Sequence, residues 1–165
     1  MHNIYMRQLT VESNRELYEM LQRIGACENE FKNTAHGLTF EEFLEWLKEQ
    51  DDWSRGKNLP SGYVAQTIFL LYDDCNVVGI GKIRHKLTEE SRKKGGNIGY
   101  AIDPLWRGKG YATIFLRMII KKAEEMCIID KFLSVEKNNP ASKKVIEKAG
   151  GKYLYENDER WFYEF

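Results

Sequence analysis

Residues 102–112 read Ile-Asp-Pro-Leu-Trp-Arg-Gly-Lys-Gly-Tyr-Ala, and the fold is decided here. The stretch begins at the end of an apolar, strand-like segment and leads into a segment whose apolar residues recur at helical spacing. Gly108 and Gly110 lie where the strand gives way to the helix. Glycines in such a loop let backbone amides approach an anion, and the helix N-terminus that follows adds positive potential. The stretch therefore predicts a phosphate-binding loop.

The chain on either side of this loop mixes helical and strand-like patterns. Upstream, the patterns first predict a strand over 4–9, a helix over 13–24 capped by Ser13, and a helix that follows a capping box of Thr39 and Glu42. A surface loop over 51–62 and a hairpin of strands over 67–72 and 76–80 follow. A solvated charged loop over 88–94 then leads to a strand over 97–102. Downstream, they predict a helix over 112–126, a strand over 132–135, a helix from Pro140 to the glycines 150–151, and paired strands over 153–155 and 160–165. The order is strand, two helices, three strands, helix, strand, helix, two strands. It predicts an α/β domain with a mixed sheet, and the length favours a single domain over residues 1–165.

Composition excludes several classes of function. Hydrophobic residues make up 42% of the chain and charged residues 30%, as in ordinary globular proteins. Lysine plus arginine balance aspartate plus glutamate at 25 each, so no net field attracts nucleic acid. The N-terminal segment has no apolar signal core, and no run of about 18 apolar residues occurs. We therefore expect neither a nucleic-acid partner nor a membrane partner.

The cysteines indicate a reducing environment. Cys27, Cys75 and Cys127 are odd in number, lie far apart and form no CxxC pair. We expect a cytoplasmic location with no zinc or other metal.

Two motifs resemble those of a known family. Arg107-x-x-Gly110-x-Ala112, directly after a strand, resembles the [QR]-x-x-G-x-[GA] signature of the GNAT acetyltransferases. Further along, Asn139-x-x-Ser142 resembles the N-x-x-[SA] start of that family's last helix, which also ends in a glycine. The resemblance covers roughly residues 76–151 and is weaker upstream, where only the order of elements agrees.

The resemblance implies the GNAT fold and acetyl-CoA as cosubstrate. The pyrophosphate would meet the backbone amides of residues 107–112, and the pantetheine arm would pair with the strand that ends at residues 102–103. The residues implied to bind coenzyme A are Ile102, Asp103, Arg107, Gly108, Lys109, Gly110, Tyr111, Ala112, Asn139 and Ser142. Lys109 is equally explained as a solvated side chain, and Asn139 as a helix cap before Pro140. The cap and the ligand contact can coexist.

The reaction implied by the resemblance is direct attack of a neutral amine on a thioester. Many family members carry a tyrosine seven positions after the asparagine, where it protonates the departing thiolate, but this chain has Ile146 there. Glu136, His85 and Tyr100 are the candidates for proton transfer, and an ordered water working through one of them fits equally well. Tyr153 is a further candidate acid, although packing also explains both tyrosines.

The acceptor is a small-molecule or peptide amine on this interpretation. The helix over 39–52 is rich in Glu and Asp, so it favours a cationic acceptor or is simply a solvated face. Trp46, Trp53 and Tyr63 flank the loop that follows this helix and would supply an aromatic wall beside the acceptor, while core packing explains Trp46 equally well. Two alternative functions stay open at this point: a catalytically silent module that binds acyl-CoA, and a nicotinamide oxidoreductase suggested by Gly108-x-Gly110. Assembly as a homodimer also stays open.

Overall fold

The computed structural model describes residues 3–12, 15–28 and 31–165, and the predicted cap at Ser13 lies outside them. The α/β class is confirmed. In chain order the elements are β1 (Ile4–Gln8), α1 (Arg15–Arg23), β2 (Cys27–Glu28), β3 (Phe31–Lys32), α2 (Phe40–Ser54), β4 (Gln66–Asp73), β5 (Asn76–Arg84), α3 (Glu89–Lys93), β6 (Ile98–Ile102), the 3-10 helix η1 (Pro104–Trp106), α4 (Tyr111–Glu125), β7 (Phe132–Glu136), α5 (Pro140–Ala149), β8 (Lys152–Glu156) and β9 (Arg160–Glu164).

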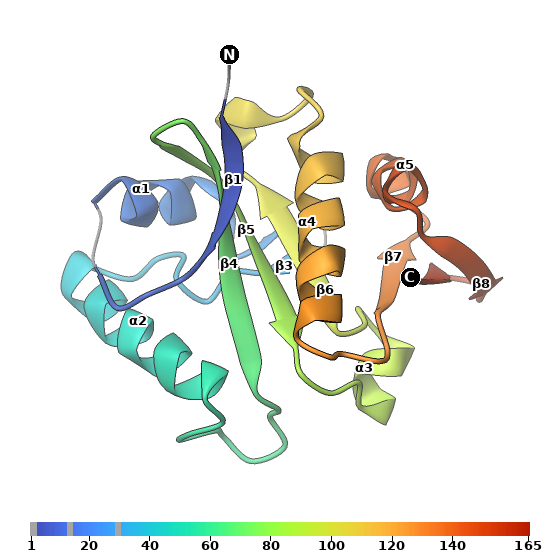
Figure 1. Cartoon of the computed structure of the whole chain (residues 1–165), viewed down its shortest axis with the longest axis horizontal. Coiled ribbons are helices and arrows are strands. Elements are labelled where there is room, and N and C mark those ends of the chain that lie inside the picture. Colours follow the sequence, from blue (N-terminus) through green and yellow to red (C-terminus); the bar gives the residue numbers. More distant parts are fainter. Residues whose placement is uncertain (1–2, 13–14, 29–30) are drawn as a thin grey trace.

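The main strands form two antiparallel sheets. One has the order β1-β4-β5-β6 and the other the order β7-β9-β8, while β2 and β3 pair separately. The mixed sheet that we predicted is therefore divided into two parts, and each ladder between described strands is antiparallel. Helices α1 and α2 cover one face of the larger sheet, whereas α4 lies on the other face with α5 and the smaller sheet beyond it (Figure 1).

Helix α2 begins as predicted but ends later. Both bonds of the capping box are present, because the Glu42 amide donates to Thr39 Oγ1 at 3.2 Å and the Thr39 amide donates to a Glu42 carboxylate oxygen at 2.7 Å. The helix continues to Ser54, so the predicted surface loop over 51–62 begins too early. Burial of Trp53 explains the difference, since this side chain extends the apolar stripe by another turn.

The solvated loop predicted over 88–94 is in fact the short helix α3. Its capping box uses a serine in place of the usual Glu or Gln. The Ser91 amide donates to Thr88 Oγ1 at 3.1 Å, and the Thr88 amide donates to Ser91 Oγ at 2.8 Å. The charged side chains that indicated a loop lie on a helix without a buried residue.

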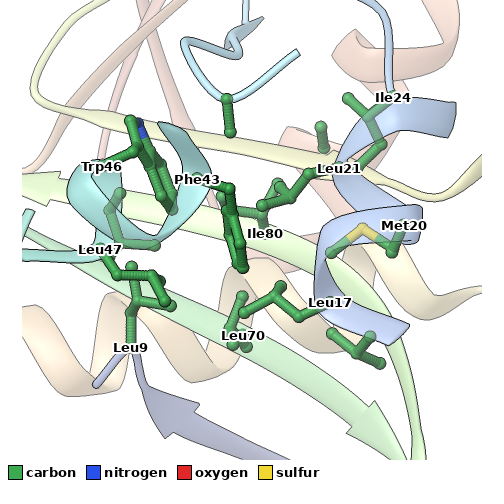
Figure 2. Packing of buried hydrophobic residues seen from close by; sticks show 14 of the residues in the cluster. Leu9, Leu17, Met20, Leu21, Ile24, Phe43, Trp46, Leu47, Leu70 and Ile80 are labelled. Atoms are coloured by element: carbon green, nitrogen blue, oxygen red, sulfur yellow. The ribbon is translucent and has the colours of Figure 1, made fainter. Parts of the chain in front are cut away.

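Two clusters of buried side chains sandwich the larger sheet. Leu70 and Ile80 face α1 and α2, where they pack with Leu17, Met20 and Phe43 among others (Figure 2). Phe69 and Leu71, which flank Leu70 on β4, face the other way and pack in the cluster that contains Phe115 and Ile119 of α4. This alternation follows from the two-residue period of a strand. The sheet is covered on both faces, and its outer strand β6 is left as an edge.

Strands β6 and β7 are the facing edges of the two sheets, and they meet at one end only. The Asn97 amide donates to the Phe132 carbonyl at 3.0 Å, and Gly96 forms an isolated bridge with Leu133. Beyond this junction, no ladder joins β6 to β7 in the described part of the chain. The two strands therefore separate and leave a cleft between the sheets.

Candidate active site

The cleft between β6 and β7 has a volume of about 870 Å³. Its walls come from β6, the loop before α4, β7 and the first turn of α5, so it unites the two sequence motifs. Nine of the sequence-predicted residues line it: Tyr100, Ile102, Arg107, Gly108, Gly110, Tyr111, Ala112, Asn139 and Ser142. The lining does not include four others, namely His85, Asp103, Lys109 and Glu136.

The glycine loop has the conformation that anion binding requires. Gly108 and Gly110 have φ angles of +77° and +86°, a left-handed conformation that side chains rarely adopt. Gly110 is the N-cap of α4 and no side chain caps this helix. The first backbone amides of a helix have no intrahelical acceptor, so an uncapped terminus that faces a cleft suits an oxyanion.

Side chains of the loop fasten it to the rest of the fold. Arg107 donates through Nε to the Ile102 carbonyl at 2.9 Å, and its guanidinium forms an ion pair with Glu28. The hydroxyl of Tyr111 donates to the buried carboxylate of Asp73, and this bond raises the pKa of Tyr111 to about 12. Lys109 lies over the Trp106 ring with Nζ 4.6 Å from its centroid. The cations that we expected at the pyrophosphate are thus held largely by protein partners.

Asp103 is a structural residue rather than part of the cleft wall. Its fully buried carboxylate accepts from Nε and from a terminal nitrogen of Arg23, at 3.0 and 2.6 Å, and it also caps η1. Its backbone amide already donates to the Val78 carbonyl at 2.9 Å. This amide is therefore occupied and does not face a ligand.

The register of β5 and β6 shows which backbone groups face the cleft. Asp103 pairs with Val78, and the Arg84 amide donates to the Asn97 carbonyl at 2.8 Å. In an antiparallel ladder, alternate residues bond to one neighbour. The intervening Tyr100 and Ile102 therefore direct their N–H and C=O groups away from β5, towards the cleft, where the Ile102 carbonyl accepts the bond from Arg107 Nε.

Asn139 caps α5 and keeps a side-chain donor for the ligand contact predicted for it. Its Oδ1 accepts from the Ser142 amide at 3.1 Å and so caps α5. Its Nδ2 is buried without a hydrogen-bond partner among the described residues. An unmet buried donor destabilises a protein unless something binds there, so this atom fits a carbonyl oxygen of a ligand in the cleft.

Only one of the three proton-transfer candidates reaches the cleft. The Tyr100 hydroxyl, on β6, lies 2.9 Å from Ser142 Oγ on α5, and burial raises the Tyr100 pKa to about 12. Glu136 forms an ion pair with Arg160 at 3.5 Å. His85 Nε2 lies 2.8 Å from Thr67 Oγ1, and burial lowers the His85 pKa. Ile146 is fully buried in the cluster beneath α4.

A second cavity of about 330 Å³ lies on the α2 side of the larger sheet. Trp46, Trp53 and Tyr63 line it, and Trp46 also belongs to the core cluster, so their role beside an acceptor stays a prediction. The acidic residues of α2 do not line it, which favours their interpretation as a solvated face; Glu45 and Asp51 form ion pairs with neighbours on the same helix. Both cavities share part of one wall, formed by Phe31, Lys32, Lys82, Arg84, Glu90 and Lys94.

The shared wall contains functional candidates that the sequence interpretation missed. Lys82 and Arg84 follow Ile80 at two-residue intervals on β5, so all three point towards α1 and α2. That alternation was visible in the sequence, but it did not show that the strand end borders two cavities. In the described residues, no group of three or more His, Cys, Asp or Glu side chains could hold a metal ion. None of the helices described is both long enough and apolar enough to cross a membrane.

Comparison with known proteins agrees with this geometry. The model of the acetyltransferase (GNAT) domain matches residues 3–152. No curated protein matches the chain significantly. The fold is similar to that of the N-acetyltransferase PseH of Campylobacter jejuni in complex with acetyl coenzyme A, with 19% identity, a TM-score of 0.64, and coverage of 99% of this chain and 98% of that one.

Two further solved structures share the fold. The ribosomal-protein-S5-alanine acetyltransferase of Vibrio fischeri has 16% identity and a TM-score of 0.70, with coverage of 100% and 93% of the two chains. An acetyl transferase of Salmonella typhimurium that modifies the N-terminal serine of ribosomal protein L7/L12 has 14% identity and a TM-score of 0.64, with coverage of 98% and 94%.

Proposed function

The chain belongs to the GNAT acetyltransferase family, and on this premise we propose that it transfers an acetyl group from acetyl-CoA to a primary amine of a small molecule or peptide. The observation that carries the proposal is the cleft of about 870 Å³, which has an uncapped helix N-terminus at one wall and the unpartnered Nδ2 of Asn139 at the other. These are donors placed for the oxygens of an extended, anionic thioester ligand.

Each wall of the cleft has a distinct part in binding acetyl-CoA. The amides at the start of α4, behind Gly108 and Gly110, would hold the pyrophosphate. The outward N–H and C=O groups of Tyr100 and the N–H of Ile102 would pair with the pantetheine arm, as an edge strand pairs with an added one. Asn139 Nδ2 would donate to a carbonyl of the same arm. Arg107 and Tyr111 position the loop, and the proposal assigns no contact to Asp103.

The chemistry is a direct transfer. The amine lone pair attacks the thioester carbonyl carbon, a C–N bond forms, and the C–S bond breaks with its electron pair going to sulfur. Tyr100 lines the cleft and its hydroxyl is protonated at neutral pH, so it would serve as the acid that protonates the thiolate. Burial raises its pKa to about 12, which makes it a weaker acid than an exposed tyrosine and limits its contribution. Glu136 and His85 stay predictions for the base, and each would act through an intervening water because neither lines the cleft.

Free-thiol release from acetyl-CoA, measured against polyamines, amino acids, aminoglycosides and peptide N-termini, tests the transfer. Thermal stabilisation by coenzyme A tests binding independently. Stabilisation without thiol release for any amine would show the silent binding module instead, and stabilisation by NAD alone would show an oxidoreductase.

Asn139→Asp tests the site itself. The variant keeps an N-cap acceptor for the Ser142 amide but loses the amide donor, so coenzyme A should bind more weakly while the melting temperature is kept. Asn157→Asp is the matched control, since the side chain of Asn157 accepts two backbone bonds and does not line the cleft. Unchanged affinity for coenzyme A in Asn139→Asp would contradict the assignment.

We also propose that the protein acts in a reducing, cytoplasmic environment, which its three exposed free cysteines support. The 1–165 domain assignment, the homodimer and the lack of nucleic-acid and membrane partners stay predictions, and light scattering in solution checks the oligomeric state.

A further inference from the structure

The wall shared by the two cavities is strongly basic. Four cations line it, namely Lys32, Lys82, Arg84 and Lys94, against the single acid Glu90. Within the described ranges, none of these four cations forms an ion pair with a carboxylate. Lys82 and Arg84 are half-buried, whereas Lys32 and Lys94 are exposed. Half-buried cations without a counter-ion are unfavourable, and such cations occur where an anionic ligand is bound.

Lys82 and Arg84 are held in place by neutral partners. Lys82 Nζ donates to the Lys32 carbonyl at 3.2 Å and lies 4.6 Å from the centroid of the Phe31 ring. Its chain crosses over Gly99, where a side chain would touch Lys82 Cγ at 3.7 Å. Arg84 donates through one terminal nitrogen to the Gly96 carbonyl at 3.0 Å. The two backbone carbonyls and the ring are uncharged, so they do not neutralise the positive charge of Lys82 or of Arg84.

The pyrophosphate of acetyl-CoA does not account for these charges. Lys82 pairs with Gly99, and Arg84 bonds to Asn97, so both stand beside the start of β6. The glycine loop follows the opposite end of that strand, after Ile102. The pantetheine arm that would run between them is uncharged. The anion that matches the basic wall must therefore belong to the acceptor.

We propose that the second cavity binds an acceptor whose amine is a few bonds from a carboxylate or phosphate group, with that group held by Arg84 and Lys82. This inference rests on the proposed acetyl transfer. Because both residues also line the acetyl-CoA cleft, an anion held there keeps a nearby amine within reach of the thioester. The remainder of the acceptor packs against Trp46, Trp53 and Tyr63, so an apolar or aromatic body is favoured.

The size of the cavity agrees with such an acceptor. A volume of about 330 Å³ is at the small end for ligand sites and suits a molecule of amino-acid size. Burial and the positive charges of Arg84 and Lys32 lower the pKa of Lys82 to about 7, which agrees with a wall whose cations have no paired carboxylate. A bound carboxylate or phosphate supplies the negative charge.

Matched acceptor pairs test the inference through kcat/KM for acetyl transfer. Phenylalanine is compared with phenylalaninamide and phenethylamine, and phosphoethanolamine with ethanolamine, so that carboxylate and phosphate are distinguished. We expect the acidic member of at least one pair to react at least about tenfold faster, as expected for a charge-assisted hydrogen bond. Neutral members that react equally well or better in both pairs would overturn the inference.

Variants show whether the basic wall causes the preference. Lys82→Met and Arg84→Met should lower kcat/KM for the acidic acceptor about tenfold more than they lower it for the neutral member of the same pair. Lys86→Met is the matched control, because Lys86 is exposed and lines neither cavity. Equal losses for both members of a pair would contradict an anion site. If Arg84→Met does not fold without its bond to Gly96, Lys82→Met gives the result alone.

A binding measurement separates this inference from the proposed function. Calorimetric titration of phenylalanine and of phosphoethanolamine in the presence of coenzyme A should show binding that Lys82→Met weakens. Such binding without transfer to any amine would support the anion site and refute the transferase. Transfer to neutral amines, with no binding of either acid, would support the transferase and refute the anion site.

Discussion

At the scale of single residues, Lys82 couples function to stability. Burial and the positive charges of Arg84 and Lys32 lower its pKa from 10.5 to about 7. Between these two values the unfolded chain binds more protons than the folded one, so the destabilisation is largest below pH 7 and fades as the pH rises towards 10.5. Lys82→Met should therefore raise the melting temperature, and by more at pH 6 than at pH 9.

Thermal unfolding at both pH values, with Lys86→Met as control, measures this effect. The control lysine is exposed and should give similar small shifts at the two pH values. If the melting temperature of Lys82→Met at pH 6 equals that of the wild type or is lower, Lys82 must have a counter-charge in the folded state.

Tyr100 is the residue from which we expect proton donation. Tyr100→Phe removes the hydroxyl that lies 2.9 Å from Ser142 Oγ and should lower kcat about tenfold, less than the roughly hundredfold minimum typical of acid–base groups, because a thiolate is a tolerable leaving group. The KM for acetyl-CoA should change little. Tyr155→Phe, on the exposed face of β8, is the control for loss of a tyrosine hydroxyl. A wild-type kcat in Tyr100→Phe would exclude the acid role.

Whether the role of a residue could be predicted from sequence depended on whether that role is performed by its backbone or by its side chain. The backbone conformation of the glycine loop was predictable, because Gly108 and Gly110 in the sequence directly indicate positive φ angles. Asp103 was not, since its partner Arg23 comes from α1, far away in the chain. Lys82 and Arg84 were missed for a similar reason, as only the packing of α2 against β4 and β5 makes a cavity beside them.

At the scale of elements, the junction of β6 and β7 is the position most sensitive to substitution. Gly96 has a φ of +80°, and a Cβ there would lie 2.0 Å from the Phe132 carbonyl oxygen. Its neighbour Gly95 has a φ of +84° with open space around a Cβ. Gly95→Ala should lower the free energy of unfolding by about 1–2 kcal/mol through backbone strain alone. Gly96→Ala should lower it further and weaken the binding of coenzyme A, because β7 must move.

Urea unfolding of the two variants and titration of each with coenzyme A distinguish the backbone strain at Gly95 from the steric clash of a Cβ at Gly96 with β7. The same loss of stability in both proteins would show that the contact of Gly96 with β7 does not set the separation of the strands.

The elements themselves were largely predictable, and their pairing was not. Helical spacing and caps identified α2, α4 and α5, because these signals are local. The helix α3 was missed because Ser91 takes the position of the usual Glu or Gln in its capping box. The division into two sheets depends on β6 and β7 meeting only near Gly96 and Asn97, and a hydrophobic pattern does not encode such a contact.

At the scale of the whole molecule, the cleft is an opening between two sheets that share few backbone bonds. The larger sheet contributes β6 and the glycine loop, and the smaller sheet contributes β7 with α5. Packing of α4 against α5 also connects the two sheets, and Ile146 of α5 is buried in the same cluster as Phe115 and Ile119 of α4. Across the cleft itself, Tyr100 and Ser142 already form one side-chain hydrogen bond, and a ligand that bonds to both walls would add further connections to it.

Hydrogen exchange in the presence of coenzyme A should detect these further connections. Saturation at about 100 times the dissociation constant stabilises the folded state by about 2.7 kcal/mol, and amides whose exchange needs opening of the cleft should slow accordingly. We expect joint protection of residues 98–102, 108–114 and 139–143, with little change over 4–8 in the strand farthest from the cleft. NAD at the same concentration should protect none of these segments. Protection confined to one wall would mean that the ligand occupies a surface groove, and the separation of β6 and β7 would then need another explanation.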